Sequence, residues 1–160
     1  MSMHPPITVQ AADSASARRE FLRLPQRLYA NDPRWVAPLE VELRERLWGG
    51  NPFLQHASAQ AWVAYAQGRA VGRISAQFDR LQQEYHDDMS GSFGLIEAED
   101  DPAVAAALLD TAAAWLRGHG LRVHHRLHEP AVAAVLVALE RDQAVAQVAT
   151  ERLAGPVGLA

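Results

Sequence analysis

The sequence contains no cysteine and no lysine, and each absence removes a class of chemistry. Without cysteine, the 160 residues can form no disulfide, no thiolate metal site and no cysteine nucleophile. All 15 basic residues are arginine, which excludes a Schiff-base lysine and the lysine of a phosphate-binding P-loop. The longest nearly apolar run, AVAAVLVALE, is too short to cross a bilayer, and the N-terminus lacks the basic and apolar pattern of a secretion signal. We therefore expect a cytoplasmic protein that does not act in a membrane.

Charge and aromatic content set two further limits. The net charge is −4 and no basic run is present, so we expect no nucleic-acid partner. Hydrophobic residues make up 49 % of the chain, which is enough for one globular domain with a core. The tryptophans, tyrosines and phenylalanines all lie at or before Trp115. The composition thus separates a core, residues 1–120, from an atypical tail, residues 121–160.

The core has the pattern β-α-α-β-β-β-α. Alternation predicts a strand over residues 7–13, and a helix follows, which we expect to break and restart at Pro25. A second helix ends at Gly49 and Gly50. Strands over 59–66 and 69–79 are joined by the tight-turn pair Gln67-Gly68, LQQEYHDDMSG is a polar loop, and a strand covers 92–98. Asp101 then caps a helix with Pro102 in its first turn.

The tail is predicted to form a short strand, residues 121–127, and an alanine- and valine-rich helix that begins at Glu129-Pro130. Because it lacks an aromatic anchor, it can contribute little dense packing, and we expect it to be the least ordered part of the chain. A truncated or frame-shifted gene is one explanation for its composition.

The core resembles the GNAT superfamily of acyl-CoA-dependent N-acyltransferases. The resemblance rests on the element order, on VGRISA in the third strand, and on FGLIEAEDD followed by ALLDTAAAWLRGHG. More narrowly, FLRLPQRLYANDPRWVAPL, NPFLQHASAQAWVAYAQGRAVGRISAQFD and GSFGLIEAEDD resemble the N-terminal half of a longer, uncharacterised bacterial GNAT-like family over about residues 21–120. The resemblance implies an α/β fold of the α+β type, with a mixed, mainly antiparallel sheet flanked by helices and incomplete at the C-terminus. It also implies acetyl-CoA or another acyl-CoA as cofactor and a small-molecule amine as acceptor.

Site residues follow from the resemblance by register. The strand residues Leu95, Ile96 and Ala98 fall where the superfamily binds the cofactor, and Glu97 falls where a catalytic base can lie. In the turn that holds the CoA pyrophosphate, the superfamily has arginine and glycines. This chain has Asp100 and Asp101 at the first two positions, and Ala103 and Ala105 at the next two glycines. Carboxylates satisfy a helix N-terminus themselves and repel an incoming anion.

Other clusters carry weaker signals. The carboxylates and histidine of EYHDD are contiguous in a polar loop, and HHRLH is predicted as strand or loop, so we expect no metal site. Tyr65 and Tyr85 are the tyrosines considered as catalytic acids, although packing explains Tyr65 better. Two readings remain open: an N-acyltransferase, or a non-catalytic GNAT-like module that pairs with a partner, as a homo-dimer or with a second GNAT-like lobe.

Overall fold

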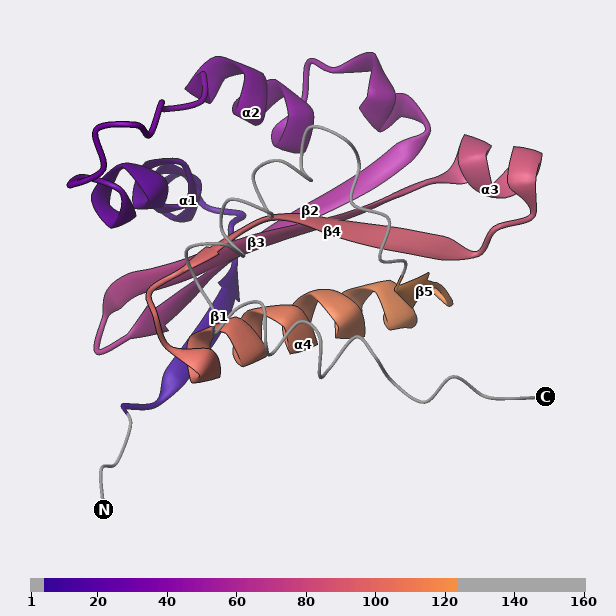
Figure 1. Cartoon of the computed structure of the whole chain (residues 1–160). Coiled ribbons are helices and arrows are strands. Elements are labelled where there is room, and N and C mark those ends of the chain that lie inside the picture. Colours follow the sequence, from indigo (N-terminus) through magenta and orange to yellow (C-terminus); the bar gives the residue numbers. More distant parts are fainter. Residues whose placement is uncertain (1–4, 124–160) are drawn as a thin grey trace.

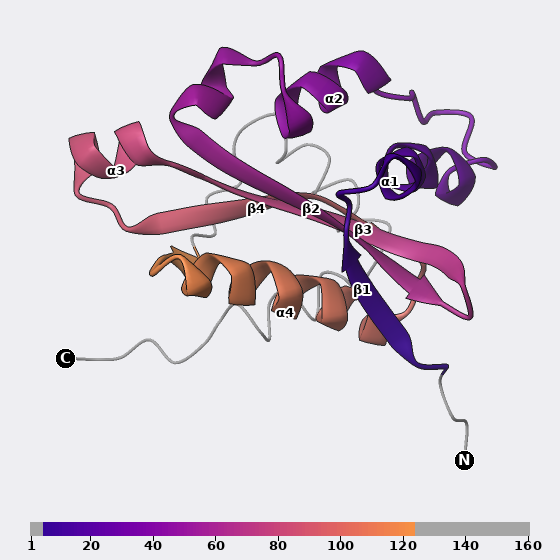
Figure 2. The ribbon, with the colours of Figure 1, turned by 180° about the vertical axis from the view of Figure 1, so that it is seen from behind.

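The computed structural model describes residues 5–123, which form a curled five-stranded sheet with helices on both faces (Figure 1). The strand order is β1-β2-β3-β4-β5. The first four strands pair antiparallel, and β5 pairs parallel to β4. Helices α1 and α2 cover one face, and α4 covers the other (Figures 1 and 2). The predicted α+β fold with a mixed, mainly antiparallel sheet is confirmed.

The elements follow one another along the chain as β1 (Ile7–Ala11), α1 (Ala15–Leu28), α2 (Glu40–Trp48), the short 3-10 helix η1 (Pro52–Gln55), β2 (Ala57–Ala66), β3 (Arg69–Asp79), α3 (Arg80–His86), β4 (Ser90–Ala98), α4 (Pro102–Gly118) and β5 (Arg122–Val123).

Local sequence signals account for several of these boundaries. Gln67 and Gly68 both have positive φ, 52° and 75°, which is the backbone of a two-residue hairpin turn between β2 and β3. The side chain of Ser14 accepts a hydrogen bond from the amide of Ala17 and caps α1. Asp101 caps α4 and Pro102 occupies its first turn, as predicted.

The two faces of the sheet have separate hydrophobic cores. The core under α4 contains Trp62, Val71, Ile74, Ile96, Val104, Leu108, Leu109 and Leu116. The core under α1 and α2 contains Phe21, Leu22, Leu24, Leu43, Leu47 and Val63. Alternate residues of β2 and β3 supply the two faces, as expected for strands covered on both sides.

Two glycines let α4 approach the sheet closely. A Cβ atom on Gly72 of β3 would lie 2.8 Å from Leu108 Cδ1 and 2.9 Å from Val104 Cγ1. A Cβ atom on Gly91 of β4 would lie 2.4 Å from Leu116 Cδ2. The helix therefore packs into positions that no larger residue can occupy without a shift.

Two predictions about local structure were wrong. Helix α1 is continuous through Pro25, because the carbonyl that Pro25 cannot bond, that of Phe21, finds a donor elsewhere in the fold. The polar segment after β3 contains helix α3, which Asp79 caps by accepting a hydrogen bond from the amide of Leu81 at 2.9 Å. Of the predicted strand over 121–127, the described part is β5; the histidines at 124, 125 and 128 and the predicted tail helix lie outside the described residues.

Candidate functional site

Strand β4 is irregular at its centre. Ser75 of β3 pairs with Gly94 and Arg73 pairs with Glu97, so β4 contains one extra residue between these rungs. Leu95 lies in this bulge with φ of 50°, a left-handed backbone that a branched residue seldom adopts. Strained backbone of this kind concentrates at functional sites, which directs attention to this part of the sheet.

Among residues 5–123, the pairing of β4 with β5 is limited to the start of β4. β5 pairs with Ser90 and Gly91 and with no later residue of β4 within residues 5–123. The backbone groups along the outer edge of residues 92–98 therefore have no strand partner in the described part of the chain. A strand edge of this kind can form main-chain hydrogen bonds with an extended ligand.

Glu97 follows the bulge and forms a buried ion pair with Arg73. Arg73 Nε donates to Glu97 Oε2 at 2.7 Å, and Nη2 lies 2.6 Å from the same oxygen. The side chains of Arg73 and Glu97 are only 2 % and 15 % exposed. Burial raises the pKa of Glu97, and the charge of Arg73 together with hydrogen bonds from Arg73 and Tyr29 offsets part of this rise.

Arg73 also connects the sheet to helix α1. Its Nη1 donates a 2.8 Å hydrogen bond to the carbonyl of Phe21, and its guanidinium lies 4.8 Å from the centroid of the Phe21 ring. This carbonyl is the acceptor that the amide four residues later would use, but that residue is Pro25. Burial lowers the pKa of Arg73, yet a guanidinium stays protonated at neutral pH. The permanently charged guanidinium thus donates to the carbonyl for which Pro25 has no amide hydrogen.

The N-terminus of α4 satisfies its own donors. The amide of Ala103 donates to Asp101 Oδ1 at 2.9 Å. The amides of Val104 and Ala105 both donate to the carbonyl of Asp101, at 3.1 and 3.3 Å. Since Pro102 has no amide hydrogen, the first turn of the helix offers an incoming anion no unbonded donor.

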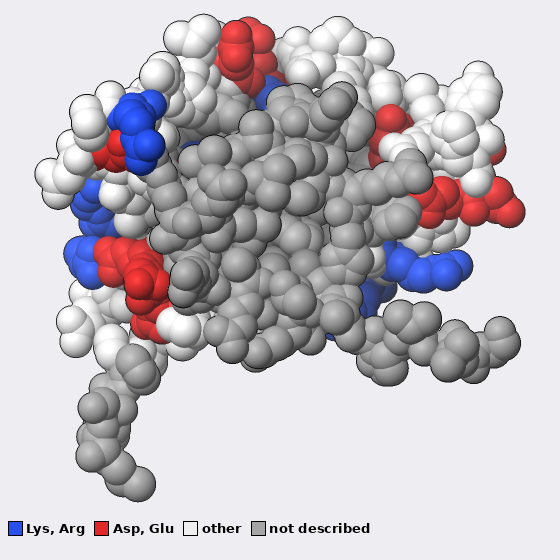
Figure 3. All heavy atoms as spheres, viewed as in Figure 1, with Lys and Arg blue, Asp and Glu red and all other residues white. Residues whose placement is uncertain are grey.

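The turn before α4 is held by a surface ion pair. Arg69, at the start of β3, forms two hydrogen bonds with Glu99: Nη2 to Oε2 at 2.9 Å, and Nη1 to Oε1. The amide of Glu99 donates to the carbonyl of Val71 at 2.8 Å. Acidic and basic groups also lie close together elsewhere on the coloured part of the surface in Figure 3. The guanidinium of Arg69, which contacts this turn, is therefore already paired.

The tyrosines considered as acids are placed differently. Tyr65, on β2, donates a hydrogen bond to Glu20 of α1. Burial, followed by the hydrogen bond and the charge of Glu20, raises the pKa of Tyr65 to about 12. Tyr85, on α3, is 82 % exposed. The contact of Tyr65 with Glu20 and the exposure of Tyr85 on α3 do not place either phenol at the β4 bulge.

Among residues 5–123, no three histidine, aspartate or glutamate side chains lie together in a way that could hold a metal ion. In the same part of the chain, no helix has the length and apolarity needed to cross a membrane.

The residues assigned from the sequence fall into two neighbouring groups. Leu95, Ile96, Glu97 and Ala98 lie at and after the bulge. Asp101, Ala103 and Ala105 lie at the start of α4, three residues further on. Their roles in catalysis and cofactor binding stay predictions.

Arg73, the ion-pair partner of Glu97, was not predicted from the sequence as a site residue. The available signal was an arginine within the apolar strand VGRIS, because a charged residue at a core position of a strand needs a partner. Glu97 could not be identified as the partner of Arg73 from the sequence, because the register of β3 and β4 depends on the bulge.

Two curated bacterial proteins match this chain in sequence. Protein YghO of Escherichia coli (strain K12) is 46 % identical over 102 residues, which are 64 % of this chain and 26 % of that protein. A bacterial ceramide synthase of Caulobacter vibrioides (strain NA1000 / CB15N) is 47 % identical over 108 residues, 66 % of this chain and 28 % of that protein. The chain thus spans about a quarter of the length of the curated relatives it matches. No family model matches the chain.

Solved structures identify the fold. A tandem GNAT protein from the clavulanic acid biosynthesis pathway superposes with a TM-score of 0.53 at 18 % identity, over 71 % of this chain and 33 % of that one. An aminoglycoside acetyltransferase from an uncultured soil metagenomic sample, in complex with sisomicin, gives a TM-score of 0.52 at 14 % identity, over 84 % and 85 % of the two chains. The chain has a GNAT-like fold and resembles part of a longer protein.

Proposed function

We propose that this chain is the acyl-CoA-binding part of an N-acyltransferase, which moves an acyl group from CoA to a small-molecule amine in the cytoplasm. The observation that carries the proposal is the β4 bulge at Leu95; in the described part of the chain, the outer edge of residues 92–98 beside it has no strand partner. The pantetheine arm of CoA contains two amide groups in an extended chain. Such an arm can add to an open strand edge by main-chain hydrogen bonds.

In this proposal, the backbone of Leu95, Ile96 and Ala98 binds the pantetheine, and the diphosphate lies near Asp101, Ala103 and Ala105. The diphosphate is held weakly, because the amides at the start of α4 are already bonded to Asp101. Affinity then comes mainly from β4 and from parts of a longer protein, in keeping with the share of the curated relatives that the chain covers. No metal takes part in the reaction as proposed.

The names of similar proteins support an amine acceptor. One curated relative is called a bacterial ceramide synthase, and a ceramide is the amide of a fatty acid with a long-chain amino alcohol. One structural neighbour is an aminoglycoside acetyltransferase solved with sisomicin. A ceramide is formed by acylation of an amine, and the aminoglycoside carries amines, so we propose a primary amine as the acceptor class.

Two measurements on the full chain test the proposal. Calorimetric titration with CoA at millimolar concentration should give measurable heat of binding. Incubation with acetyl-CoA or lauroyl-CoA and a panel of primary amines, including sphinganine, should release CoA thiol only when an amine is present. No heat and no thiol release would remove the enzyme function from this chain.

A second candidate function is a non-catalytic GNAT-like module that pairs with a second GNAT-like lobe or a second copy of the chain. The self-satisfied start of α4 favours it, because a binding module does not need a diphosphate site. The same calorimetric titration distinguishes the two functions, since the module would give no heat with CoA. Light scattering over a range of protein concentrations would then report self-association.

A further inference from the structure

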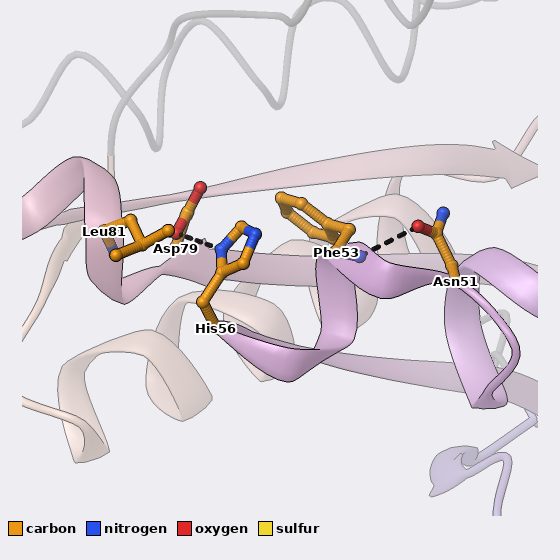
Figure 4. Close-up of polar contacts among 5 residues, drawn as sticks. All are labelled: Asn51, Phe53, His56, Asp79 and Leu81. Carbon is orange, nitrogen blue, oxygen red and sulfur yellow. Dashed lines mark hydrogen bonds and ion pairs between the residues drawn. The ribbon is translucent and has the colours of Figure 1, made fainter.

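A histidine and an aspartate form a close pair on the α1 and α2 side of the sheet. His56 Nδ1 lies 2.8 Å from Asp79 Oδ1. Figure 4 shows the two side chains directed toward one another, His56 from the end of η1 and Asp79 from the end of β3. The ring of Phe53 packs at right angles to the imidazole, with centroids 5.4 Å apart.

The backbone around His56 is fixed on both sides. Its amide donates to the carbonyl of Phe53 at 3.3 Å, and its carbonyl accepts from the amide of Arg80 at 2.9 Å. The side chain of Asn51 caps η1 by accepting from the amide of Phe53 at 2.9 Å (Figure 4). The imidazole is thus held in one orientation, yet its side chain remains 34 % exposed.

Asp79 determines which nitrogen of the ring carries the proton. Burial alone would raise the pKa of Asp79, but hydrogen bonds from His56 and from the amides of Leu81 and Gln82 outweigh it and hold the pKa below its ordinary value. An ionised carboxylate at Nδ1 stabilises the Nδ1–H form of the neutral ring. Nε2, which has no hydrogen-bond partner among residues 5–123, then has a free lone pair. This is the arrangement in which an aspartate prepares a histidine to accept a proton.

The pair lies near the open part of β4. Alternate residues of β3 share a face, so Asp79 lies on the same side as Ser75 and Gln77. The register places Gln77 opposite Ser92 and Ser75 opposite Gly94. Asp79 is therefore two residues, about 7 Å, along β3 from the rung of Ser92, the first residue of β4 beyond its pairing with β5 within residues 5–123. An amine bound on this face beside Ser92 would therefore lie near His56.

Acyl transfer to an amine needs a base, and Glu97 is poorly placed to serve. Its Oε2 already accepts from Nε and Nη2 of Arg73 inside the protein, and Tyr29 forms a further hydrogen bond. We propose that His56 is the general base that accepts the proton of the amine, with Asp79 as the positioning residue. This inference rests on the acyltransferase function proposed above.

The proposed step uses the amine and the acyl-CoA thioester as its two substrates. The amine nitrogen forms a bond to the thioester carbonyl carbon, and the nitrogen proton passes to His56 Nε2. The carbon–sulfur bond then breaks, and its electron pair leaves with the CoA thiolate, which takes a proton from water. Within residues 5–123, the charged group paired with His56 is Asp79 of β3; η1 presents Phe53 and carries no charged side chain.

The test compares His56→Gln with His86→Gln, a matched control at an exposed position on α3. The rate of amine-dependent thiol release should fall at least 100-fold in H56Q and stay unchanged in H86Q, because general base catalysis contributes about 10²–10⁴-fold. Added imidazole should restore part of the rate in H56Q, which a purely structural role for His56 would not permit. Equal CoA affinity in wild type and H56Q shows that the variant is folded.

Asp79→Asn gives an independent reading. Asparagine can still cap α3, but it lacks the charge that favours the Nδ1–H form. Nitrogen-15 spectra should show His56 with its proton on Nδ1 in wild type and shifted toward Nε2 in D79N, with a rate loss of about tenfold or more. If wild type transfers acyl groups and H56Q does so at the same rate, the assignment of His56 is overturned while the proposed function stands. If wild type binds no CoA or transfers nothing, both are overturned.

Discussion

Arg73 of β3 and Glu97 of β4 lie opposite each other on adjacent strands and form an ion pair. The side chain of Arg73 is only 2 % exposed. Its guanidinium also bonds the carbonyl of Phe21 in α1. One side chain thus joins the strand with the bulge to the helix above it. Removal of either charge leaves the other buried without an opposite charge beside it.

Substitution Glu97→Gln should strongly destabilise the fold. It leaves the charge of Arg73 uncompensated in the interior, which costs about 3–5 kcal/mol of unfolding free energy. Urea denaturation at neutral pH measures this cost. The matched control is Glu99→Gln, which breaks an exposed ion pair and should leave the midpoint nearly unchanged. Equal midpoints for the two variants would show that the buried ion pair contributes no more to the free energy of unfolding than the exposed one.

The complementary substitution, Arg73→Met, should make stability depend on pH. Burial already raises the pKa of Glu97 in the folded state, and loss of Arg73 removes the charge that offsets this rise. The folded-state pKa then lies above the unfolded value. Stability is therefore fully present below the unfolded pKa, about 4.3, and is lost as pH rises through the folded pKa. The double variant R73M/E97L should recover most of the stability at neutral pH, because apolar residues often replace a buried pair without loss.

Gly72→Ala should weaken the packing of α4 on the sheet. The new methyl group would lie within 3 Å of Leu108 and Val104, and overpacking of a core costs about 1–3 kcal/mol. Thermal unfolding followed by circular dichroism reports the change. Gly94→Ala, on β4, is the control, because among residues 5–123 its Cβ atom would meet only Ser75 Oγ, at 3.8 Å. A midpoint for G72A equal to that of G94A would contradict the close approach of the helix.

Tyr65 should ionise well above the usual range of a phenol. Burial and Glu20 raise its pKa to about 12, so the tyrosinate absorbance of wild type minus that of Tyr65→Phe should titrate with a midpoint near that pH. The contribution of Tyr65 to stability is present below pH 10, the ordinary pKa, and is lost as pH rises toward about 12. A difference curve centred at pH 10 would show that the contact with Glu20 is absent in solution.

Carboxylates near the start of α4 should weaken CoA binding. Asp101→Ser keeps a side chain that can cap the helix but removes a negative charge, worth about 1 kcal/mol at 4 Å in water, so CoA affinity should rise about fivefold. Glu99→Gln should act in the same direction, because it releases Arg69 to bind phosphate. Glu42→Gln on α2, which lies on the other face of the sheet, is the control (Figure 1). Unchanged affinity in both test variants would place the diphosphate elsewhere.

How far the sequence predicts this structure depends on the distance between interacting partners. The hairpin at Gln67-Gly68 and the helix start at Asp101-Pro102 were predicted, because adjacent residues determine them. The break at Pro25 was predicted wrongly, because the donor that compensates it is Arg73, far along the chain. Local sequence rules account for the amide hydrogen that Pro25 lacks. They do not reveal the guanidinium of Arg73, which donates to the carbonyl of Phe21 instead.

The candidate site divides in the same way. The sequence located the strand with Leu95 and Glu97 and the capped start of α4, since both follow from local pattern and from the resemblance to the GNAT superfamily. It did not predict that Glu97 is buried against Arg73, nor that His56 meets Asp79. Arg73 and Glu97 lie on neighbouring strands, and His56 directly precedes β2, which pairs with the strand of Asp79. Both contacts depend on strand register, which turns and the bulge determine.

Binding of acyl-CoA to the outer edge of β4 can be followed in the ¹⁵N-labelled chain, which is titrated with CoA to millimolar concentration while the backbone amide shifts are recorded. We expect saturable shifts concentrated on the amides of residues 92–98, with smaller ones at the start of α4. No saturable shift, or shifts confined to surfaces away from β4, would contradict it.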